Sequence, residues 1–149
     1  MRFLFIQILL TSFLISSGIL RTDGRIIINE NNEKVILKGF GLGGWLVLEG
    51  YMWNFPGFGS TTTMENAVID LLGEQKADQF FDRYRSNYIT EKEISFLAES
   101  GFNALRVPLH YKHFSPSFNE FTDIGFDLLE PIINACRDND MYVVLDMHA

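Results

Sequence analysis

The feature that most constrains the fold of this 149-residue chain is a regular alternation of short apolar runs and amphipathic helical patterns. The last run, Met141–Leu145, is apolar throughout, as in strands that are buried on both faces of a parallel sheet. Another buried strand is predicted over residues 103–107, with Pro108 ending it. The first strand is expected within residues 38–49. Strand, helix, strand, helix, strand is typical of βαβ units, so the sequence predicts an α/β fold with a parallel sheet.

Turn and capping signals locate the other elements before the second strand. A β-hairpin is predicted from the β-branched runs at residues 25–29 and 34–37, which flank a polar turn. Capping-box patterns at residues 62–65 and 90–93 predict the starts of two helices, and a further amphipathic helix is expected over residues 74–84.

The last helix is expected to begin with the pattern at residues 127–130, because Pro131 is tolerated only near a first turn. Residues 138–140 are expected to end it, and Gly101 is expected to end the helix before it. Cys136, the only cysteine, occupies an apolar position of the last helix. We therefore predict a buried structural thiol, with neither a disulfide framework nor a thiolate-rich metal site.

Residues 1–18 are predicted to be a secretory signal peptide. Arg2 precedes an apolar run over residues 3–15, and small residues follow it. This run is shorter than the roughly 20 residues of a comfortable membrane span, although an uncleaved anchor stays an alternative. The mature part, residues 19–149, is therefore expected to be secreted, in the extracellular space or the periplasm.

The formal net charge of the chain is −7, and its Lys and Arg residues form no basic run. Nucleic-acid binding needs clustered positive charge to neutralise phosphates. The charge pattern therefore argues against a nucleic-acid partner. No segment after residue 18 is apolar enough to suggest a membrane span.

Polar side chains follow the ends of the three predicted strands. Glu49 follows the first strand, Arg106 lies near the end of the second, and Asp146 and His148 follow the third. The carboxyl ends of parallel strands gather at one edge of a sheet, where α/β proteins bind ligands. An arginine in a buried strand is costly unless it is paired, so Arg106 is expected to have a carboxylate neighbour.

Several segments together resemble glycoside hydrolase family 5, and within it the exo-β-1,3-glucanase branch. Gly-Gly-Trp-Leu-Val-Leu-Glu at residues 43–49 is similar to the N-terminal signature of that family. Residues 88–91 and 101–108 resemble its first helix and second strand, and residues 144–148 resemble its third strand. The likeness extends in the right order over about residues 24–149.

The resemblance implies an N-terminal fragment, about three of eight βα units, of a (β/α)₈ barrel. It also implies a secreted retaining β-glycosidase that acts on β-glucan or related oligosaccharides, needs no cofactor and is a monomer when full length. The matching substrate-binding residues are Glu49, Arg106 and His148. The acid/base and nucleophile glutamates are expected beyond Ala149, so the fragment alone is expected to be inactive.

Two positions depart from the family pattern. Gly50 replaces a usual proline, and Lys112 stands where a tryptophan is often found, which leaves the linkage and the sugar open. Glu49 and Asp146 could instead form a catalytic pair, but Asp146 is expected to orient or to pair with Arg106.

Two other classes of function stay open. A metal-dependent hydrolase could use His110-x-x-His113 with Asp146-x-His148, although solvent-facing roles are favoured for the two loop histidines. A non-catalytic sugar-binding protein is the other. Four aromatic residues would suit it, although packing over a barrel rim explains them equally well: Trp45, Tyr51, Trp53 and Phe55.

Overall fold

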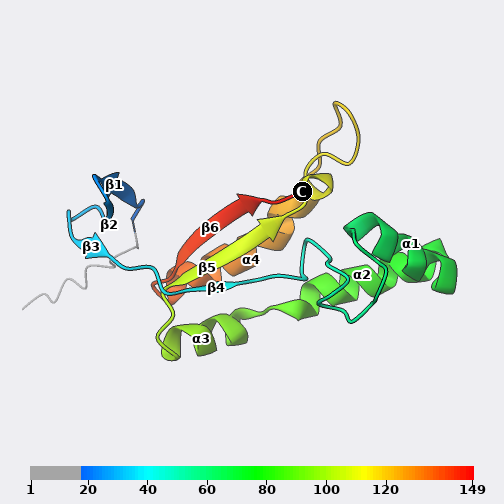
Figure 1. The fold of residues 1–149 in the computed structure, drawn as a ribbon, viewed down its shortest axis with the longest axis horizontal. Coiled ribbons are helices and arrows are strands. Elements are labelled where there is room, and N and C mark those ends of the chain that lie inside the picture. The colour runs from blue at the N-terminus through cyan, green and yellow to red at the C-terminus, as the bar shows by residue number, and fades with distance from the viewer. Residues whose placement is uncertain (1–17) are drawn as a thin grey trace, which may run out of the picture.

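A computed structural model describes residues 18–149, so the predicted signal peptide lies, apart from Gly18, outside the described residues. Three parallel strands form the central sheet (Figure 1), in the order β4 (Gly39–Gly41), β5 (Ala104–Leu109) and β6 (Tyr142–Met147). The register pairs Arg106 with Gly41 on one side and with Val144 on the other. The predicted α/β fold with a parallel sheet is therefore confirmed.

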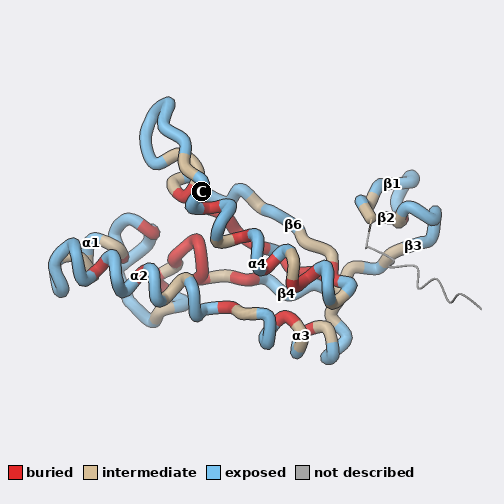
Figure 2. The backbone as a smooth tube through the Cα atoms, turned by 180° about the vertical axis from the view of Figure 1, so that it is seen from behind, coloured by how far each residue is buried: buried red, intermediate tan, exposed pale blue. Residues whose placement is uncertain are grey.

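The helices lie around this sheet. Helix α3 (Glu91–Glu99) precedes β5, and α4 (Ile124–Asp138) connects β5 to β6 and lies behind the strands (Figure 1). Helices α1 (Thr61–Leu72) and α2 (Glu74–Tyr88) pack on each other to one side, and the short 3-10 helix η1 (Tyr111–His113) follows β5. Buried residues concentrate where β5, α3, α4 and the segment after β4 meet (Figure 2).

The N-terminal residues form a separate antiparallel sheet of β1 (Arg21–Asp23), β2 (Ile26–Ile28) and β3 (Lys34–Val35). Strands β2 and β3 are the predicted hairpin. Strand β1 was not predicted, and it pairs with β2 through a tight turn in which Gly24 has a φ of 57°. Glycine adopts that conformation without strain.

The two predicted capping boxes have different outcomes. Thr90 and Glu93 cap each other at the start of α3, as predicted. Helix α1, in contrast, starts at Thr61, and its capping box joins Ser60 to Thr63. The prediction of a box at residues 62–65 is wrong because Ser60 already supplies the cap, and Glu65 bonds elsewhere.

Strand β5 continues through Pro108 to Leu109 instead of ending before the proline. The carbonyl oxygen of Arg106 faces β4, because it accepts a hydrogen bond of 2.8 Å from the N–H of Leu42. Pro108, two residues further on, has its nitrogen on the same side. Strand β4 has already ended at Gly41, so the N–H that proline lacks has no strand to bond.

Helix α4 also contains a proline, Pro131, which was predicted to lie near its first turn. The helix begins at Ile124, so Pro131 lies in its interior, and the predicted start is wrong. Pro131 and Asp127, whose carbonyl loses its bond to residue 131, are both exposed, so water can satisfy that group. The helix is held by its opposite face, which buries Leu129, Ile132, Ala135 and Cys136.

Strand β6 differs from the predicted strand buried on both faces. Val144, Leu145 and Met147 are all exposed. Among the described residues β6 pairs only with β5, so its other edge and part of each face are open. Of the helices between residues 18 and 149, none combines the length and apolar character needed to cross a bilayer.

Candidate sugar-binding site

Arg106, Asp146 and His148 form one cluster at the carboxyl end of the sheet. The Arg106 guanidinium forms an ion pair with Asp146, and His148 Nδ1 lies 3.2 Å from Arg106 Nη2 and 3.1 Å from Asp146 Oδ2. The pairing of β5 with β6 places Arg106 opposite Val144, so the side chains of Arg106 and Asp146 share one face. The carboxylate neighbour predicted for Arg106 is therefore present.

Which ring nitrogen of His148 carries the proton depends on which neighbour Nδ1 bonds. An arginine N–H can only donate, whereas an ionised carboxylate can only accept. When Nδ1 accepts from Arg106, the ring proton of the neutral imidazole is on Nε2, which is then a donor for a ligand.

This cluster is open to solvent rather than buried. The side chains of Arg106, Asp146 and His148 are 45%, 31% and 43% exposed. An exposed ion pair contributes only about 0–1 kcal/mol to stability. Both contacts of Arg106 within the cluster use Nη2, which leaves its other N–H groups for a further partner. The arrangement therefore suits ligand binding better than it suits stabilisation of the fold.

Glu49 lies near this cluster but not in contact with it. Its carboxylate is 3.4 Å from the Tyr51 hydroxyl and lies close to Gly43. Gly43 follows Leu42, whose N–H bonds to Arg106 at 2.8 Å. Within the described part of the chain, no hydrogen bond joins Glu49 to Arg106 or to His148. The structure thus brings two of the three predicted site residues together and places the third at the same end of the sheet.

An open hollow of about 530 Å³ adjoins Glu49 and is lined by residues 49–51 and 54–59. Gly50 makes this loop possible. A Cβ added there would collide with the carbonyl oxygen of Phe58, and the carbonyl of Gly50 accepts from the N–H of Phe55 at 2.8 Å. The loop folds back onto residue 50, so only a residue without a Cβ fits there. This explains why glycine stands at this position instead of the usual proline.

The four aromatic residues proposed as sugar platforms divide into two pairs. Trp45 is buried and donates through Nε1 to the carbonyl of Arg85 at 2.8 Å. Trp53 packs against the ring of Tyr84 and is partly buried. Tyr51 and Phe55 are exposed and line the hollow beside Glu49. Trp45 and Trp53 are thus packing residues, which is the alternative explanation given for them from the sequence.

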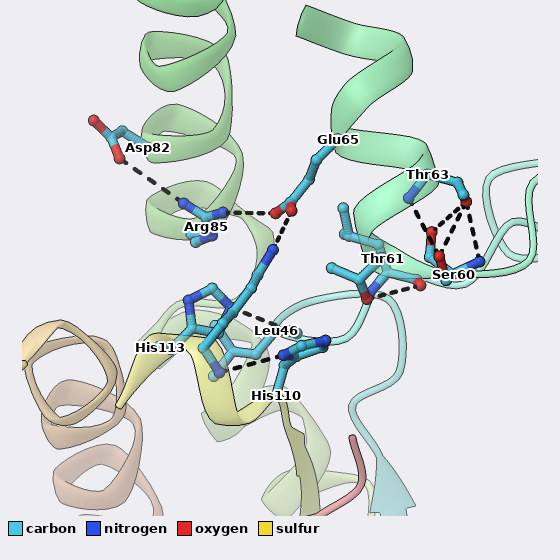
Figure 3. Close-up of polar contacts among 11 residues, drawn as sticks. Leu46, Ser60, Thr61, Thr63, Glu65, Asp82, Arg85, His110 and His113 are labelled. Carbon is cyan, nitrogen blue, oxygen red and sulfur yellow. Dashed lines mark hydrogen bonds and ion pairs between the residues drawn. The ribbon is translucent and has the colours of Figure 1, made fainter. Parts of the chain in front are cut away.

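The apolar segment before Glu49 is buried, although it is not a strand. Side chains from other elements form hydrogen bonds with its backbone, among them those of Thr61 and His113, which Figure 3 labels. Thr61 Oγ1 accepts from the N–H of Leu48 at 3.0 Å and donates to its carbonyl at 3.2 Å. His113 Nε2 lies 3.2 Å from the carbonyl oxygen of Leu46. These contacts satisfy buried backbone groups that would otherwise be costly.

The glycine pair before this segment is fixed by two tyrosines of α2. Tyr84 donates to the carbonyl of Gly44, and Tyr88 donates to that of Gly43 at 2.5 Å. Burial raises the pKa of Tyr84 to about 12 and also raises the pKa of Tyr88, so both hydroxyls keep their protons. Gly44 has a φ of 78°, which explains why glycine stands there.

The two loop histidines are buried, contrary to the solvent-facing roles expected for them. Burial, reinforced by Arg85 and Lys112, lowers the pKa of His113 to about 4. Burial, followed by the charge of Lys112, also lowers the pKa of His110. Between residues 18 and 149 no group of three or more His, Cys, Asp or Glu side chains is placed to hold a metal. The metal-dependent alternative therefore finds no site there.

A second charged cluster was not predicted. Glu65 of α1 forms ion pairs with Arg85 of α2, at 3.4 Å, and with Lys112 of η1. These side chains are only 17–22% exposed. Only Lys112, which departs from the family pattern, hints at this cluster in the sequence.

Cys136 is buried, as predicted. Burial raises the pKa of its thiol to about 11, so the thiol stays protonated and unreactive.

The comparisons with known proteins agree with this geometry. A model of the family described as cellulase (glycosyl hydrolase family 5) matches residues 60–149. The chain belongs to glycosyl hydrolase family 5. A β-xylosidase of Phanerodontia chrysosporium is 32% identical over 131 residues, which cover 87% of this chain and 27% of that protein. A probable glucan 1,3-β-glucosidase A of Aspergillus clavatus is 29% identical over 131 residues, which cover 87% of this chain and 31% of its own.

A solved structure supports the fold assignment. The rutinosidase of Aspergillus niger superposes with a TM-score of 0.60 at 20% identity, over 74% of this chain and 32% of that structure. The chain thus spans roughly a quarter to a third of the length of the relatives it matches. The parallel β4–β5–β6 sheet with its helices corresponds to the predicted N-terminal part of a (β/α)₈ barrel.

Proposed function

We propose that this chain carries part of the sugar-binding site of a secreted, retaining β-glycosidase that acts on β-glucan or related oligosaccharides. Glu49, Arg106 and His148 are the proposed substrate-binding residues. The observation that carries the proposal is the exposed cluster of Arg106, Asp146 and His148 at the ends of two adjacent parallel strands. The similarity to a β-xylosidase and to a probable glucan 1,3-β-glucosidase supports a glycoside substrate.

The side chains at this end of the sheet complement a sugar chemically. The Glu49 carboxylate can accept hydrogen bonds from sugar hydroxyls, and His148 can donate through Nε2. Tyr51 and Phe55 offer exposed aromatic surface beside Glu49 for the apolar C–H face of a pyranose ring. A hollow of about 530 Å³ is large enough for a sugar ring.

The proposed mechanism is double displacement by two glutamates. Retaining glycosidases hold two carboxyl groups about 5 to 5.5 Å apart, one as nucleophile and one as acid/base. We place both glutamates beyond Ala149, so residues 1–149 alone would not hydrolyse a glycoside. The first glutamate attacks the anomeric carbon while the second protonates the leaving oxygen, and the second then activates water.

Arg106 has a defined part in this mechanism. Its positive charge would hold the nucleophile ionised, because an opposite charge nearby favours the charged form of a carboxylate. Asp146 orients the guanidinium and is not one of the catalytic pair, since it is already engaged by Arg106. Glu49 and His148 would hold the sugar hydroxyls, which contributes binding energy as the ring distorts toward the transition state.

The remaining parts of the proposal concern the chain outside the site. Residues 1–18 would direct secretion and be removed, and the full-length enzyme would act as a monomer without a cofactor. A non-catalytic sugar-binding protein is the competing function, favoured only by Tyr51 and Phe55 at the hollow.

The stereochemistry of hydrolysis tests the proposed function. The full-length enzyme that contains this chain is mixed with a β-1,3-linked gluco-oligosaccharide, and the anomer first released is read by proton NMR. We expect the β-anomer, as double displacement requires. Release of the α-anomer would contradict the mechanism, and binding of the sugar without cleavage would favour the non-catalytic function.

A further inference from the structure

The charged cluster around Glu65 joins three elements that are separate in the sequence. Glu65 Oε1 on α1 lies 3.4 Å from Arg85 Nη2 on α2 (Figure 3). Glu65 Oε2 pairs with Lys112 on η1. All three side chains are largely shielded from water. A carboxylate that is shielded and shared by two cations fixes its partners more firmly than an exposed pair does.

The same three elements hold the segment that leads to Glu49. Helix α1 contributes Thr61, which bonds both backbone groups of Leu48. Helix α2 contributes the carbonyl of Arg85, which accepts from the indole of Trp45. Helix η1 contributes His113, which bonds the carbonyl of Leu46 at 3.2 Å. Each element that Glu65 connects therefore supplies at least one hydrogen bond to residues 45–48.

These two sets of contacts have a consequence for the sugar site. Residues 45–48 form neither helix nor strand, so their position depends on the elements that bond them. Glu49 follows directly, and its carboxylate is placed by the backbone of this segment. We infer that Glu65 is a positioning residue: by joining α1, α2 and η1, it holds Glu49 where it can bind the sugar. The inference rests on the proposed function of Glu49.

The charge of Glu65 is essential to this role. Replacement by glutamine keeps the shape of the side chain but leaves Arg85 and Lys112 without a counter-charge in a shielded place. The two cations then repel each other, and α2 and η1 are free to separate. Asp82 provides a matched control, because its carboxylate also lies near Arg85, at 4.0 Å, but is 81% exposed and does not contact Lys112.

A double-mutant cycle in the full-length enzyme distinguishes positioning from general stabilisation. The kcat/KM for an aryl β-glucoside is measured for wild type, Glu65→Gln, Glu49→Ala and the double variant, with Asp82→Asn as control. We expect Glu65→Gln to lower kcat/KM about tenfold in the wild-type background and less than about twofold in the Glu49→Ala background, because residues that act through one another are not additive. Asp82→Asn is expected to change kcat/KM less than about twofold.

Other outcomes overturn the inference, and they separate it from the proposed function. Equal losses from Glu65→Gln in both backgrounds would mean that Glu65 only stabilises the fold, while Glu49 keeps its proposed role. An unchanged kcat/KM in Glu49→Ala would remove Glu49 from the site, and it would overturn both the inference about Glu65 and the proposed role of Glu49. Should Glu65→Gln fail to fold, Lys112→Met breaks only the link to η1, and the same cycle with that variant decides between these outcomes.

Discussion

Two regions of this chain place a carboxylate beside an arginine, and they differ in their access to water. At the end of the sheet, Arg106 and Asp146 are 45% and 31% exposed, and His148 beside them is exposed as well. Between α1, α2 and η1, Glu65 and Arg85 are 18% and 17% exposed. The first cluster can exchange water for a ligand at little cost to the fold. The second cluster is enclosed by the fold and is therefore suited to holding elements together.

The largest expected effect is on catalysis, from Arg106→Ala. In the full-length enzyme we expect kcat/KM to fall between about 100- and 1,000-fold, because a charge aimed at the reacting groups is lost. The melting temperature should change little, since the ion pair is exposed. Arg137→Ala is the matched control, because Arg137 pairs with Asp138 at 3.5 Å on the surface, away from the site. Unchanged turnover in Arg106→Ala would exclude Arg106 from the site.

The next largest effect is a pH dependence confined to the enclosed cluster. His113 has a pKa of about 4 in the fold against 6.5 in a model peptide, because it is buried beside Arg85 and Lys112, with Glu65 and His110 also near. The unfolded chain therefore binds the proton first. The free energy of unfolding therefore carries no penalty from His113 above pH 6.5. It decreases as the pH drops toward 4, by at most about 3 kcal/mol.

Urea unfolding at pH 7 and pH 4.5 checks this dependence. The wild type should lose more stability between these two values than His113→Gln does. Equal losses in wild type and His113→Gln would refute the assignment.

A direct comparison of the two carboxylates gives a smaller effect. Glu65→Gln should reduce the free energy of unfolding by about 2 kcal/mol, because two shielded cations lose their partner. Asp146→Asn should reduce it by less than about 1 kcal/mol, because water replaces the lost partner. Denaturant midpoints measured under the same conditions would reveal the difference. A larger loss from Asp146→Asn would reverse the roles given to the two clusters.

The smallest effect on stability is expected from Gly50→Ala. The added Cβ collides with the carbonyl oxygen of Phe58, and the loop must open to relieve it, at a cost of about 1 kcal/mol. The hollow beside Glu49 should change shape, so KM for an oligosaccharide should rise more than stability falls. Gly39→Ala is the control, because a Cβ there would make only ordinary contact with Ala104, at 3.6 Å, and would lie outside the hollow. Equal KM values for both variants would mean that the hollow does not bind substrate.

The strand-end cluster could be predicted from the sequence because it follows local rules. Apolar runs predict two strands of the sheet, and parallel strands align their ends, so the sequence alone predicts that Arg106 and His148 lie together. The capping box at Thr90 depends on residues three apart and was also predicted. Local patterns are sufficient where the partner is close in the sequence or is set by the sheet register.

The enclosed cluster could not be predicted because its partners are distant. Glu65 and Lys112 are 47 residues apart, and the pattern around Glu65 is equally consistent with a helix cap. The apolar segment at residues 45–48 has the composition of a strand, yet it is held by side chains of Thr61 and His113. Pro108 lies within a strand because β4 is short, which depends on the sheet as a whole.

The measurement that tests the central claim most directly is a crystal structure of the full-length enzyme with a β-linked glucose disaccharide. We predict sugar hydroxyls within about 3.2 Å of the Glu49 carboxylate and of the His148 imidazole, with Arg106 beside the nucleophilic glutamate. A disaccharide bound elsewhere, with none of these three side chains near the sugar or the nucleophile, would contradict the account.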